Sequence, residues 1–206
     1  MSKPIIIAIC GPSASGKDTL AKALLKYLQR KKDANLIEEN SRLIVSDTTR
    51  PIRKNEQEGV DYNFVTNEEF DARDQRREYL EVYEYGPQRW RYATPKGQFN
   101  ARINIGVFSP SGIKMLRKHF SDSYSLVVVY VDAFMITRLF RSIKRDGKLR
   151  WEHLRRARQD NKDFLYWWSI LIDDEYNFIY CHSESVDAMT KRVYNILCTR
   201  GFLNPK

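Results

Sequence analysis

Residues 11–18 read GPSASGKD, with two glycines and a lysine at the spacing of the phosphate-binding pattern G-x-x-x-x-G-K-[ST]. Gly11 and Gly16 permit unusual backbone dihedral angles and close approach of a phosphate, and Lys17 adds a positive charge for the outer phosphates. A helical pattern follows, so the partial positive charge of its N-terminus adds to anion binding. The spacing therefore predicts a nucleotide-phosphate site. Its residues are Gly11, Pro12, Ser13, Ala14, Ser15, Gly16, Lys17, Asp18 and Thr19.

The position after Lys17 departs from this pattern, because it holds Asp18 where a hydroxyl side chain normally helps to bind Mg²⁺. Carboxylate oxygens are good ligands for a hard cation. We therefore interpret Asp18 as a candidate Mg²⁺ ligand, with the hydroxyl of Thr19 as a second candidate. A structural alternative stays open, because a carboxylate in the first turn of a helix is stabilised by free N–H groups and by the helix dipole.

A second cluster of anion-binding side chains lies within residues 47–100. Arg50 and Arg53 are three residues apart in a proline-containing turn. The planar fork of arginine binds phosphate oxygens better than lysine does where geometry matters. Tyr62 and Tyr92 can each donate a phenolic hydrogen bond to the same anion. On composition alone, a solvated basic loop with core tyrosines is the other interpretation.

Residues 138–158 hold nine Lys or Arg residues and only two acidic ones, so most of the net charge of +9 belongs to this segment. Such a charge suits an anionic partner. Arg141 and Arg145 lie four residues apart and so share one helical face. In phosphoryl transfer, arginines on a movable segment neutralise the transferred group and exclude water. The alternatives are a solvated basic face or a nucleic-acid surface, and we do not expect a nucleic-acid partner.

The elements that must position these groups alternate along the chain, which predicts an α/β fold with right-handed crossovers. Apolar runs without alternation predict strands buried on both faces of a parallel sheet, at residues 5–10, 43–45, 103–108, 126–131 and 178–181. Helical patterns follow the glycine loop and occupy residues 111–120, 133–144, 151–168 and 186–198. Residues 47–100 break the alternation with only short strand-like pieces, which indicates an inserted, mostly β subdomain.

Composition narrows the class of protein. The 206 residues suit one domain, and 42% hydrophobic residues suffice for a core. No apolar run reaches the length of a membrane span, and the run IIIAIC leads into glycines instead of a cleavage site. We therefore expect a cytoplasmic protein with no membrane partner. Cys10, Cys181 and Cys198 form no C-x-x-C pair and, with three scattered histidines, give no metal-ligand spacing, which favours buried free thiols.

Three strings of the chain resemble motifs of the guanylate kinase family. They are GPSxSGK in the glycine loop, TTRPxR…GxDYxFV from residue 48 onward, and the strand that begins YLE. The resemblance covers nearly the whole chain. It implies a P-loop kinase core of about five parallel strands flanked by helices, an inserted mostly β NMP-binding subdomain and a helical lid. The implied boundaries are 1–46, 101–137 and 159–206 for the core, 47–100 for the NMP-binding subdomain and 138–158 for the lid.

The same resemblance implies phosphoryl transfer from ATP to GMP, and also to dGMP, with Mg²⁺. It implies that Ser46 and Glu81 contact the guanine base, with Thr94 near it. A carboxylate accepts hydrogen bonds from both N1–H and the N2 amine of guanine, and adenine lacks these donors. The implied ligands of the monophosphate are Arg50, Arg53, Tyr62 and Tyr92. The implied catalytic residues are Lys17, Arg50 and the lid arginines Arg141, Arg145 and Arg156.

Two positions depart from the family pattern. Asp18 replaces the hydroxyl residue, and Ser109 stands where the family's third strand ends in the acid of D-x-x-G. Our hypothesis is that Asp18 restores, near the Mg²⁺, the carboxylate charge that is lost at Ser109. The same departures leave a ribose 1,5-bisphosphate phosphokinase-like enzyme, or another (d)NMP kinase, as alternatives. A non-catalytic binding module is disfavoured because the loop and the arginines are kept. The sequence leaves the choice between monomer and homodimer open.

Overall fold

The structure is a computed structural model that describes residues 3–85, 88–147, 151, 155, 158, 160 and 177–205. The helix expected over residues 151–168 therefore lies almost entirely outside the described residues, as does Arg156. Within the described residues, no helix has both the length and the apolar character needed to cross a membrane.

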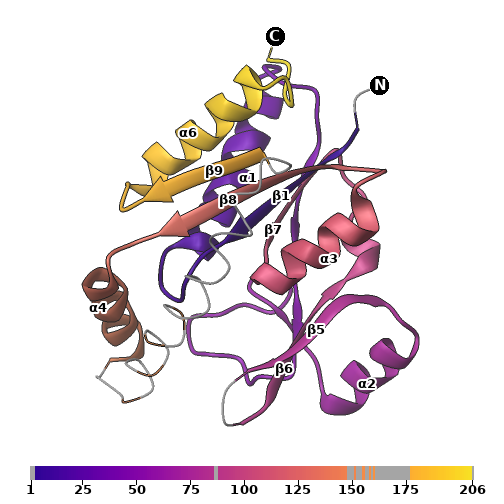
Figure 1. Cartoon of the computed structure of the whole chain (residues 1–206), viewed down its shortest axis with the longest axis vertical. Coiled ribbons are helices and arrows are strands. Elements are labelled where there is room, and N and C mark those ends of the chain that lie inside the picture. Colours follow the sequence, from indigo (N-terminus) through magenta and orange to yellow (C-terminus); the bar gives the residue numbers. More distant parts are fainter. Residues whose placement is uncertain are drawn as a thin grey trace.

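A five-stranded parallel sheet forms the centre of the molecule (Figure 1). Its order is β2-β7-β1-β8-β9, so β1 lies in the middle. The strands are β1 (Ile5–Cys10), β2 (Ser41–Ile44), β7 (Ile103–Val107), β8 (Ser125–Asp132) and β9 (Asn177–His182). The parallel sheet predicted from the unbroken apolar runs is confirmed. The phosphate loop and the start of the segment after β8 both leave the sheet at its carboxyl edge, where ligands of such sheets bind.

Helices cover both faces of this sheet, which explains why every residue of β1 is buried. Side chains 5, 7 and 9 pack in a core cluster with α1 (Lys17–Asp33) and α6 (Val186–Thr199). Side chains 6, 8 and 10 pack in a second cluster with α3 (Pro110–Phe120) on the other face. The apolar stripe Leu20, Leu24 and Leu28 of α1 is fully buried. This packing fixes the start of α1 directly beyond the end of β1.

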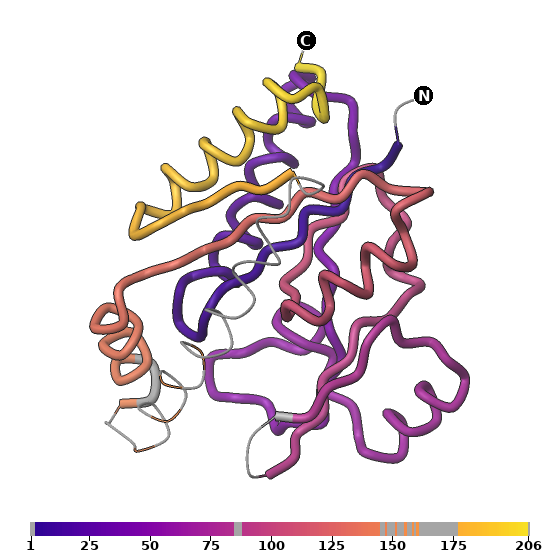
Figure 2. The backbone as a smooth tube through the Cα atoms, in the orientation of Figure 1, coloured from indigo at the N-terminus to yellow at the C-terminus, as the bar shows by residue number. Residues whose placement is uncertain are grey.

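Between β2 and β7 the chain forms a second sheet in the order β4-β3-β6-β5. Figure 2 shows this segment, coloured purple to magenta, as the lower right part of the view. The strands are β3 (Asp47–Thr48), β4 (Asn63–Phe64), β5 (Tyr79–Tyr85) and β6 (Trp90–Pro95). This segment also contains α2 (Asn67–Gln75), which the mostly β interpretation overlooked. A capping box marks its start, since Thr66 accepts from the Glu69 N–H and the Glu69 carboxylate accepts from the Thr66 N–H.

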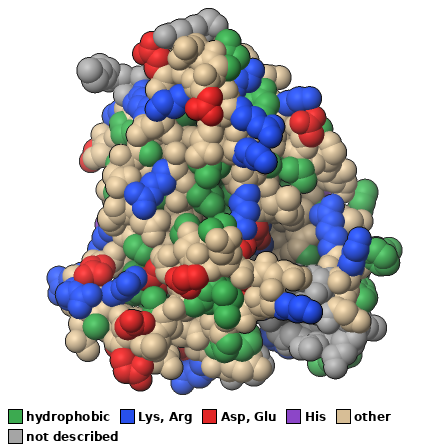
Figure 3. All heavy atoms as spheres, turned by 180° about the vertical axis from the view of Figure 1, so that it is seen from behind, with side chains coloured by type: hydrophobic (Ala, Val, Ile, Leu, Met, Phe, Trp, Pro, Cys, Tyr) green, Lys and Arg blue, Asp and Glu red, His purple; other side chains and the backbone are tan. Residues whose placement is uncertain are grey.

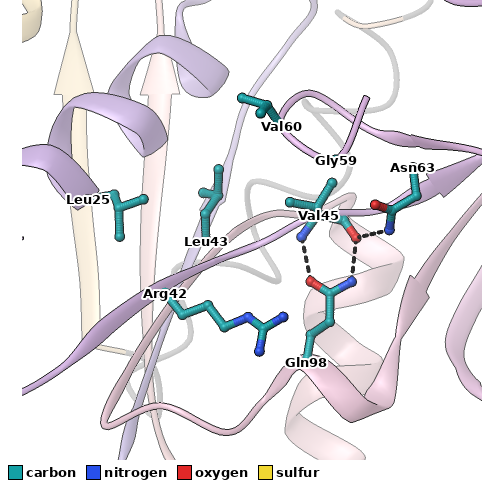
Figure 4. Close-up of a pocket in the computed structure, with 8 residues that line it drawn as sticks. All are labelled: Leu25, Arg42, Leu43, Val45, Gly59, Val60, Asn63 and Gln98. Carbon is teal, nitrogen blue, oxygen red and sulfur yellow. Dashed lines mark hydrogen bonds between the residues drawn. The ribbon is translucent and has the colours of Figure 1, made fainter. Parts of the chain in front are cut away.

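The two crossings between the sheets are joined by one side-chain amide (Figure 4). Gln98 Oε1 accepts from the Val45 N–H at 2.8 Å, and Gln98 Nε2 donates to the Val45 carbonyl at 2.8 Å. Gln98 belongs to a 3₁₀ turn, η1 (Lys96–Gln98), just before the chain returns to β7. The amide thus acts as a strand partner for Val45. A cavity of about 370 Å³ opens beside it, lined by Leu25, Arg42, Leu43, Val45, Gly59, Val60, Asn63 and Gln98.

After β8 the chain forms α4 (Met135–Asp146), which ends at Gly147 in the left-handed conformation with φ of 74°. Phe134, Ile136 and Phe140 on and beside this helix are exposed.

From behind (Figure 3), the coloured Lys and Arg side chains are spread over the visible face instead of forming one patch.

Candidate functional site

The glycine loop connects β1 to α1, and its backbone conformation is suited to binding an anion. Gly11 has φ of 147°, and a Cβ built on it would lie 2.0 Å from the Val131 carbonyl oxygen, so no other residue fits. Gly16 has φ of 107° and directly precedes α1, where it is the N-cap. No described side chain caps this helix. The first N–H groups of α1 are therefore available to an anion.

The side chains of the loop also fit a phosphate ligand. Ser15 is buried, and its Oγ has no hydrogen-bond partner among the described atoms, as expected of a polar group that a ligand would satisfy. Lys17 folds back over the loop, with Nζ donating to the Pro12 carbonyl at 3.4 Å. Asp18 is exposed, and its carboxylate lies 3.9 Å from Lys17 Nζ.

The residues around the loop are compatible with Mg²⁺ but do not form a complete protein cage for it. Among the described residues, no group of three His, Cys, Asp or Glu side chains could hold a metal. Asp18 and Thr19 offer a carboxylate and a hydroxyl, both exposed. Mg²⁺ is usually bound by one or two protein oxygens together with substrate phosphates and water, so these residues fit that mode.

Arg141 of α4 also contacts the loop. Its Nη1 donates to the Ser15 carbonyl at 2.8 Å and lies 3.3 Å from the Ala14 carbonyl. In a trans peptide the N–H points away from the carbonyl, so this contact turns the Gly16 N–H toward the opposite face of the loop. Arg141 therefore orients the cradle as well as adding charge. The side chain of Arg145, like Arg156, lies outside the described residues.

Asp160, which belongs to none of the sequence motifs, also holds the loop. Asp160 Oδ2 accepts from the Ser13 N–H at 2.8 Å, and Oδ1 lies 3.4 Å from Ser13 Oγ. Asp160 Oδ2 is also 3.5 Å from Arg138 Nη1, and both side chains are nearly buried. Arg138 in turn donates from Nε to the Ala133 carbonyl at 3.1 Å. The loop is thus tied through one carboxylate to the end of β8.

The predicted phosphate-binding arginines lie together, and a carboxylate joins them. Arg50 is 3% exposed and forms a two-bond pair with Glu56, with distances of 2.9 Å from Nη1 and 2.8 Å from Nη2. The Glu56 carboxylate also accepts from the Arg53 N–H at 2.9 Å, and Arg53 Nη1 lies 3.7 Å away. Hydrogen bonds from Arg50 and Arg53 outweigh burial and lower the pKa of Glu56. The sequence motifs do not include Glu56.

Both predicted phosphate-binding tyrosines flank Arg50. The guanidinium carbon of Arg50 lies 5.3 Å from the centre of the Tyr62 ring, and Tyr62 meets Tyr92 edge-on at 5.8 Å. Tyr83 stacks on Tyr92 at 5.2 Å. Burial raises the pKa of the Tyr62 hydroxyl far above its ordinary value, and the charge of Asp18 adds to this rise. The phenol is therefore protonated and can donate, and the influence of Asp18 shows that the start of α1 is near it.

A direct ion pair also joins α1 to the acceptor segment. Lys22 Nζ donates to Asp61 Oδ1 at 2.6 Å, and Asp61 accepts from the Gln57 N–H as well. Lys22 is on the first turns of α1, and Asp61 directly precedes Tyr62. This contact joins the helix that follows the glycine loop to the segment that contains Tyr62. Neither residue was singled out from the sequence.

The predicted base-binding acid, Glu81, is half-buried on β5 of the second sheet. Burial raises the pKa of Glu81 to about 7, against the hydrogen bonds from Ser109 and Thr94, which lower it. Ser109 Oγ lies 3.1 Å from Glu81 Oε2, and Thr94 Oγ1 lies 3.5 Å from Glu81 Oε1. Ser46 is half-buried at the crossing from β2 to β3, where its carbonyl accepts from the Asn63 N–H.

Known proteins that are similar to this chain are guanylate kinases. A family model described as guanylate kinase matches residues 1–176. A guanylate kinase of Thermotoga maritima is 29% identical over 197 residues, covering 89% of this chain and 82% of that protein. A guanylate kinase of Rickettsia bellii is 38% identical over 109 residues, covering 52% of this chain and only 49% of that protein.

A solved structure supports the fold. The crystal structure of a guanylate kinase from Anaplasma phagocytophilum superposes with a TM-score of 0.65 and covers 97% of this chain and 87% of the other. The sequence identity over that superposition is 20%, so the likeness concerns the fold.

Proposed function

This chain belongs to the guanylate kinase family, and we propose that it transfers the γ-phosphoryl group of ATP to GMP, and also to dGMP. The observation that supports this best is a pair of neighbouring anion sites. One is the uncapped start of α1 with Lys17 and the buried Ser15 hydroxyl. The other is Arg50 with Tyr62, close enough to the loop for the charge of Asp18 to raise the pKa of Tyr62.

In the proposed reaction, an oxygen of the GMP phosphate attacks the γ-phosphorus of ATP, and the bond to the β,γ-bridging oxygen breaks, which releases ADP. No general base is needed, because the attacking phosphate is already anionic. Lys17 and the loop N–H groups hold the ATP phosphates. Arg50, Arg53, Tyr62 and Tyr92 hold the GMP phosphate.

Charge on the transferred group is neutralised in this proposal by arginines of the segment after β8. They are Arg141, Arg145 and Arg156. Arg141 already contacts the loop, through the Ser15 carbonyl. Mg²⁺, held by Asp18 and Thr19 together with the nucleotide, would screen the phosphate charges when bound. Segment 138–158 would act as the lid that excludes water from the site.

Base selection is assigned to Glu81, with Ser46 and Thr94 beside it. The Glu81 carboxylate accepts from N1–H and the N2 amine of guanine, which lie side by side. Adenine offers no donor at these positions and would leave two acceptor positions of the half-buried acid unfilled, a mismatch that can reject an analogue by about 10⁴–10⁵.

A coupled ADP-release assay tests the proposal, with Mg²⁺ and ATP, against GMP, dGMP, AMP, UMP, CMP, dTMP and ribose 1,5-bisphosphate. We expect turnover with GMP and dGMP and little with the rest, and Lys17→Ala should chiefly lower kcat. Turnover with ribose 1,5-bisphosphate alone would replace the proposal with that activity. Absence of ADP release with every acceptor would indicate a non-catalytic member of the family.

A further inference from the structure

Ser109 stands where the family pattern has an acid, which we expected near the Mg²⁺. It follows β7 and is the N-cap of α3, where its Oγ accepts from the Gly112 N–H at 3.0 Å. The same Oγ lies 3.1 Å from Glu81 Oε2 and 2.8 Å from Ser111 Oγ. A residue that is 28 positions from Glu81 in the sequence is therefore in direct contact with the predicted base-reading carboxylate.

The direction of these hydrogen bonds follows from counting protons. A serine hydroxyl has one proton and two lone pairs. In its ionised form the Glu81 carboxylate can only accept, so in that form the Ser109 proton goes to Glu81. The Ser109 lone pairs then accept from the Gly112 N–H and from the Ser111 hydroxyl. A chain of donors that starts at the N-terminus of α3 ends on Oε2 of Glu81, and each bond strengthens the next.

The Glu81 carboxylate also contacts Thr94 and lies close to Gly112. Thr94 Oγ1 lies 3.5 Å from Oε1, so each carboxylate oxygen has one hydroxyl neighbour. A Cβ on Gly112 would lie 2.2 Å from Oε1, so only glycine lets the carboxylate rest on the first turn of α3. A carboxylate has about four acceptor positions. Two are directed to the hydroxyls, and one on each oxygen is left for a ligand.

We propose that Ser109 is a positioning residue for base selection, which fixes the Glu81 carboxylate so that both oxygens face two adjacent N–H donors of a 2-amino-6-oxopurine. This inference rests on the proposed function. Burial raises the pKa of Glu81 to about 7, so near neutral pH the carboxylate is easily protonated. The Ser109 hydroxyl stabilises the charged form and so keeps the acceptor available.

The test compares Ser109→Ala with wild type by steady-state kinetics from pH 5.5 to 9. Loss of a hydrogen bond to a charged group should raise KM for GMP on the order of tenfold, with KM for ATP and kcat little changed. The pH at which 1/KM for GMP falls on the acid side should move upward, because Glu81 loses a donor. The second ionisation of GMP itself is common to both enzymes and does not affect the difference.

Two variants separate positioning from helix capping. Ser109→Thr keeps the hydroxyl and should restore the KM for GMP. Ser185→Ala removes the matching N-cap of α6, where Ser185 accepts from the Ala188 N–H at 3.2 Å, and should leave KM for GMP unchanged. If Ser109→Ala changes KM and its pH dependence no more than Ser185→Ala does, the inference is wrong.

A measurement without substrate distinguishes this inference from the proposed function. The carboxyl carbon of Glu81, followed by NMR in the free protein, should titrate at higher pH in Ser109→Ala than in wild type. An unchanged titration would overturn the inference even in an active GMP kinase. A raised titration in a protein that fails to phosphorylate GMP would leave the contact standing and overturn the proposed function.

Discussion

The buried pair between Arg50 and Glu56 gives the sharpest test of how the acceptor site is built. Glu56→Gln keeps the shape of the side chain and one oxygen acceptor, but removes the charge that faces Arg50 and the Arg53 N–H. The Arg50 side chain is 3% exposed and that of Glu56 is 15% exposed, so water replaces little of the lost interaction.

The magnitude follows from that burial. Removing one partner of a buried ion pair costs about 3–5 kcal/mol, because the other charge stays buried without compensation. The glutamine oxygen still accepts one hydrogen bond from Arg50, so we expect a loss of about 2–3 kcal/mol in the free energy of unfolding. For a chain of this length, that loss lowers Tm by roughly 4–12 °C. KM for GMP should also rise, because Arg50 loses the contact that fixes its fork.

Urea unfolding followed by circular dichroism measures the effect as a function of pH. The pKa of Glu56 is lower in the folded protein than in the unfolded chain, where a glutamate titrates at about 4.3. Its contribution to stability is therefore complete above about pH 4.3 and is lost as the pH falls through the folded value. The difference between wild type and Glu56→Gln should be full at pH 7 and shrink below pH 4.

Glu84→Gln is a matched control, because Glu84 makes a similar two-bond contact with Arg89 at an exposed site. Exposed ion pairs contribute little to stability, so this variant should unfold almost like wild type. Equal stability of Glu56→Gln and wild type at pH 7, with an unchanged KM for GMP, would refute the reasoning about the acceptor arginines.

Three further predictions concern the other carboxylates of the site. Glu81→Gln should reduce the preference for GMP over AMP by at least about tenfold, measured as the ratio of kcat/KM values; an intact preference would show that the base site lies elsewhere. Asp160→Asn should raise KM for ATP several-fold and leave KM for GMP alone, because it weakens the bond to the Ser13 N–H; equal changes in both would contradict a local role. Asp18→Ser should raise the Mg²⁺ concentration needed for half-maximal activity, and an unchanged Mg²⁺ titration would exclude Asp18 as a ligand.

Sequence patterns predicted the features that neighbouring residues encode. Gly11, Gly16 and Lys17 lie within seven residues, directly after the strand β1 and at the start of the helix α1. The loop could therefore be predicted from neighbouring residues alone. The unbroken apolar runs likewise predicted the parallel sheet. Helix α2 was missed because Phe70 is its only buried residue and it shows no apolar stripe, although its capping box was readable.

The contacts by which carboxylates hold the site together could not be predicted in the same way. Asp160 bonds to a residue 147 positions away, so only the folded chain brings the two together. The resemblance implied a role for Glu81, but not its contact with Ser109, which is 28 positions away. Glu56 is near Arg50 in sequence, but acidic residues are common in loops. Its importance follows from the burial of the pair, and burial is a property of the tertiary structure.

Ser109 and Asp18, the two departures from the family pattern, contact different residues in the structure. Ser109 contacts Glu81, so an acid at position 109 would lie against a second, half-buried carboxylate, and the repulsion would raise the pKa of the pair. Asp18 is exposed at the start of α1, beside Lys17. If the departures were one exchange of charge around Mg²⁺, Ser109→Asp would rescue the Mg²⁺ dependence of Asp18→Ser. The contacts argue against rescue: Ser109→Asp should change the pH dependence of GMP binding, and the effects of the two substitutions should add in the double variant.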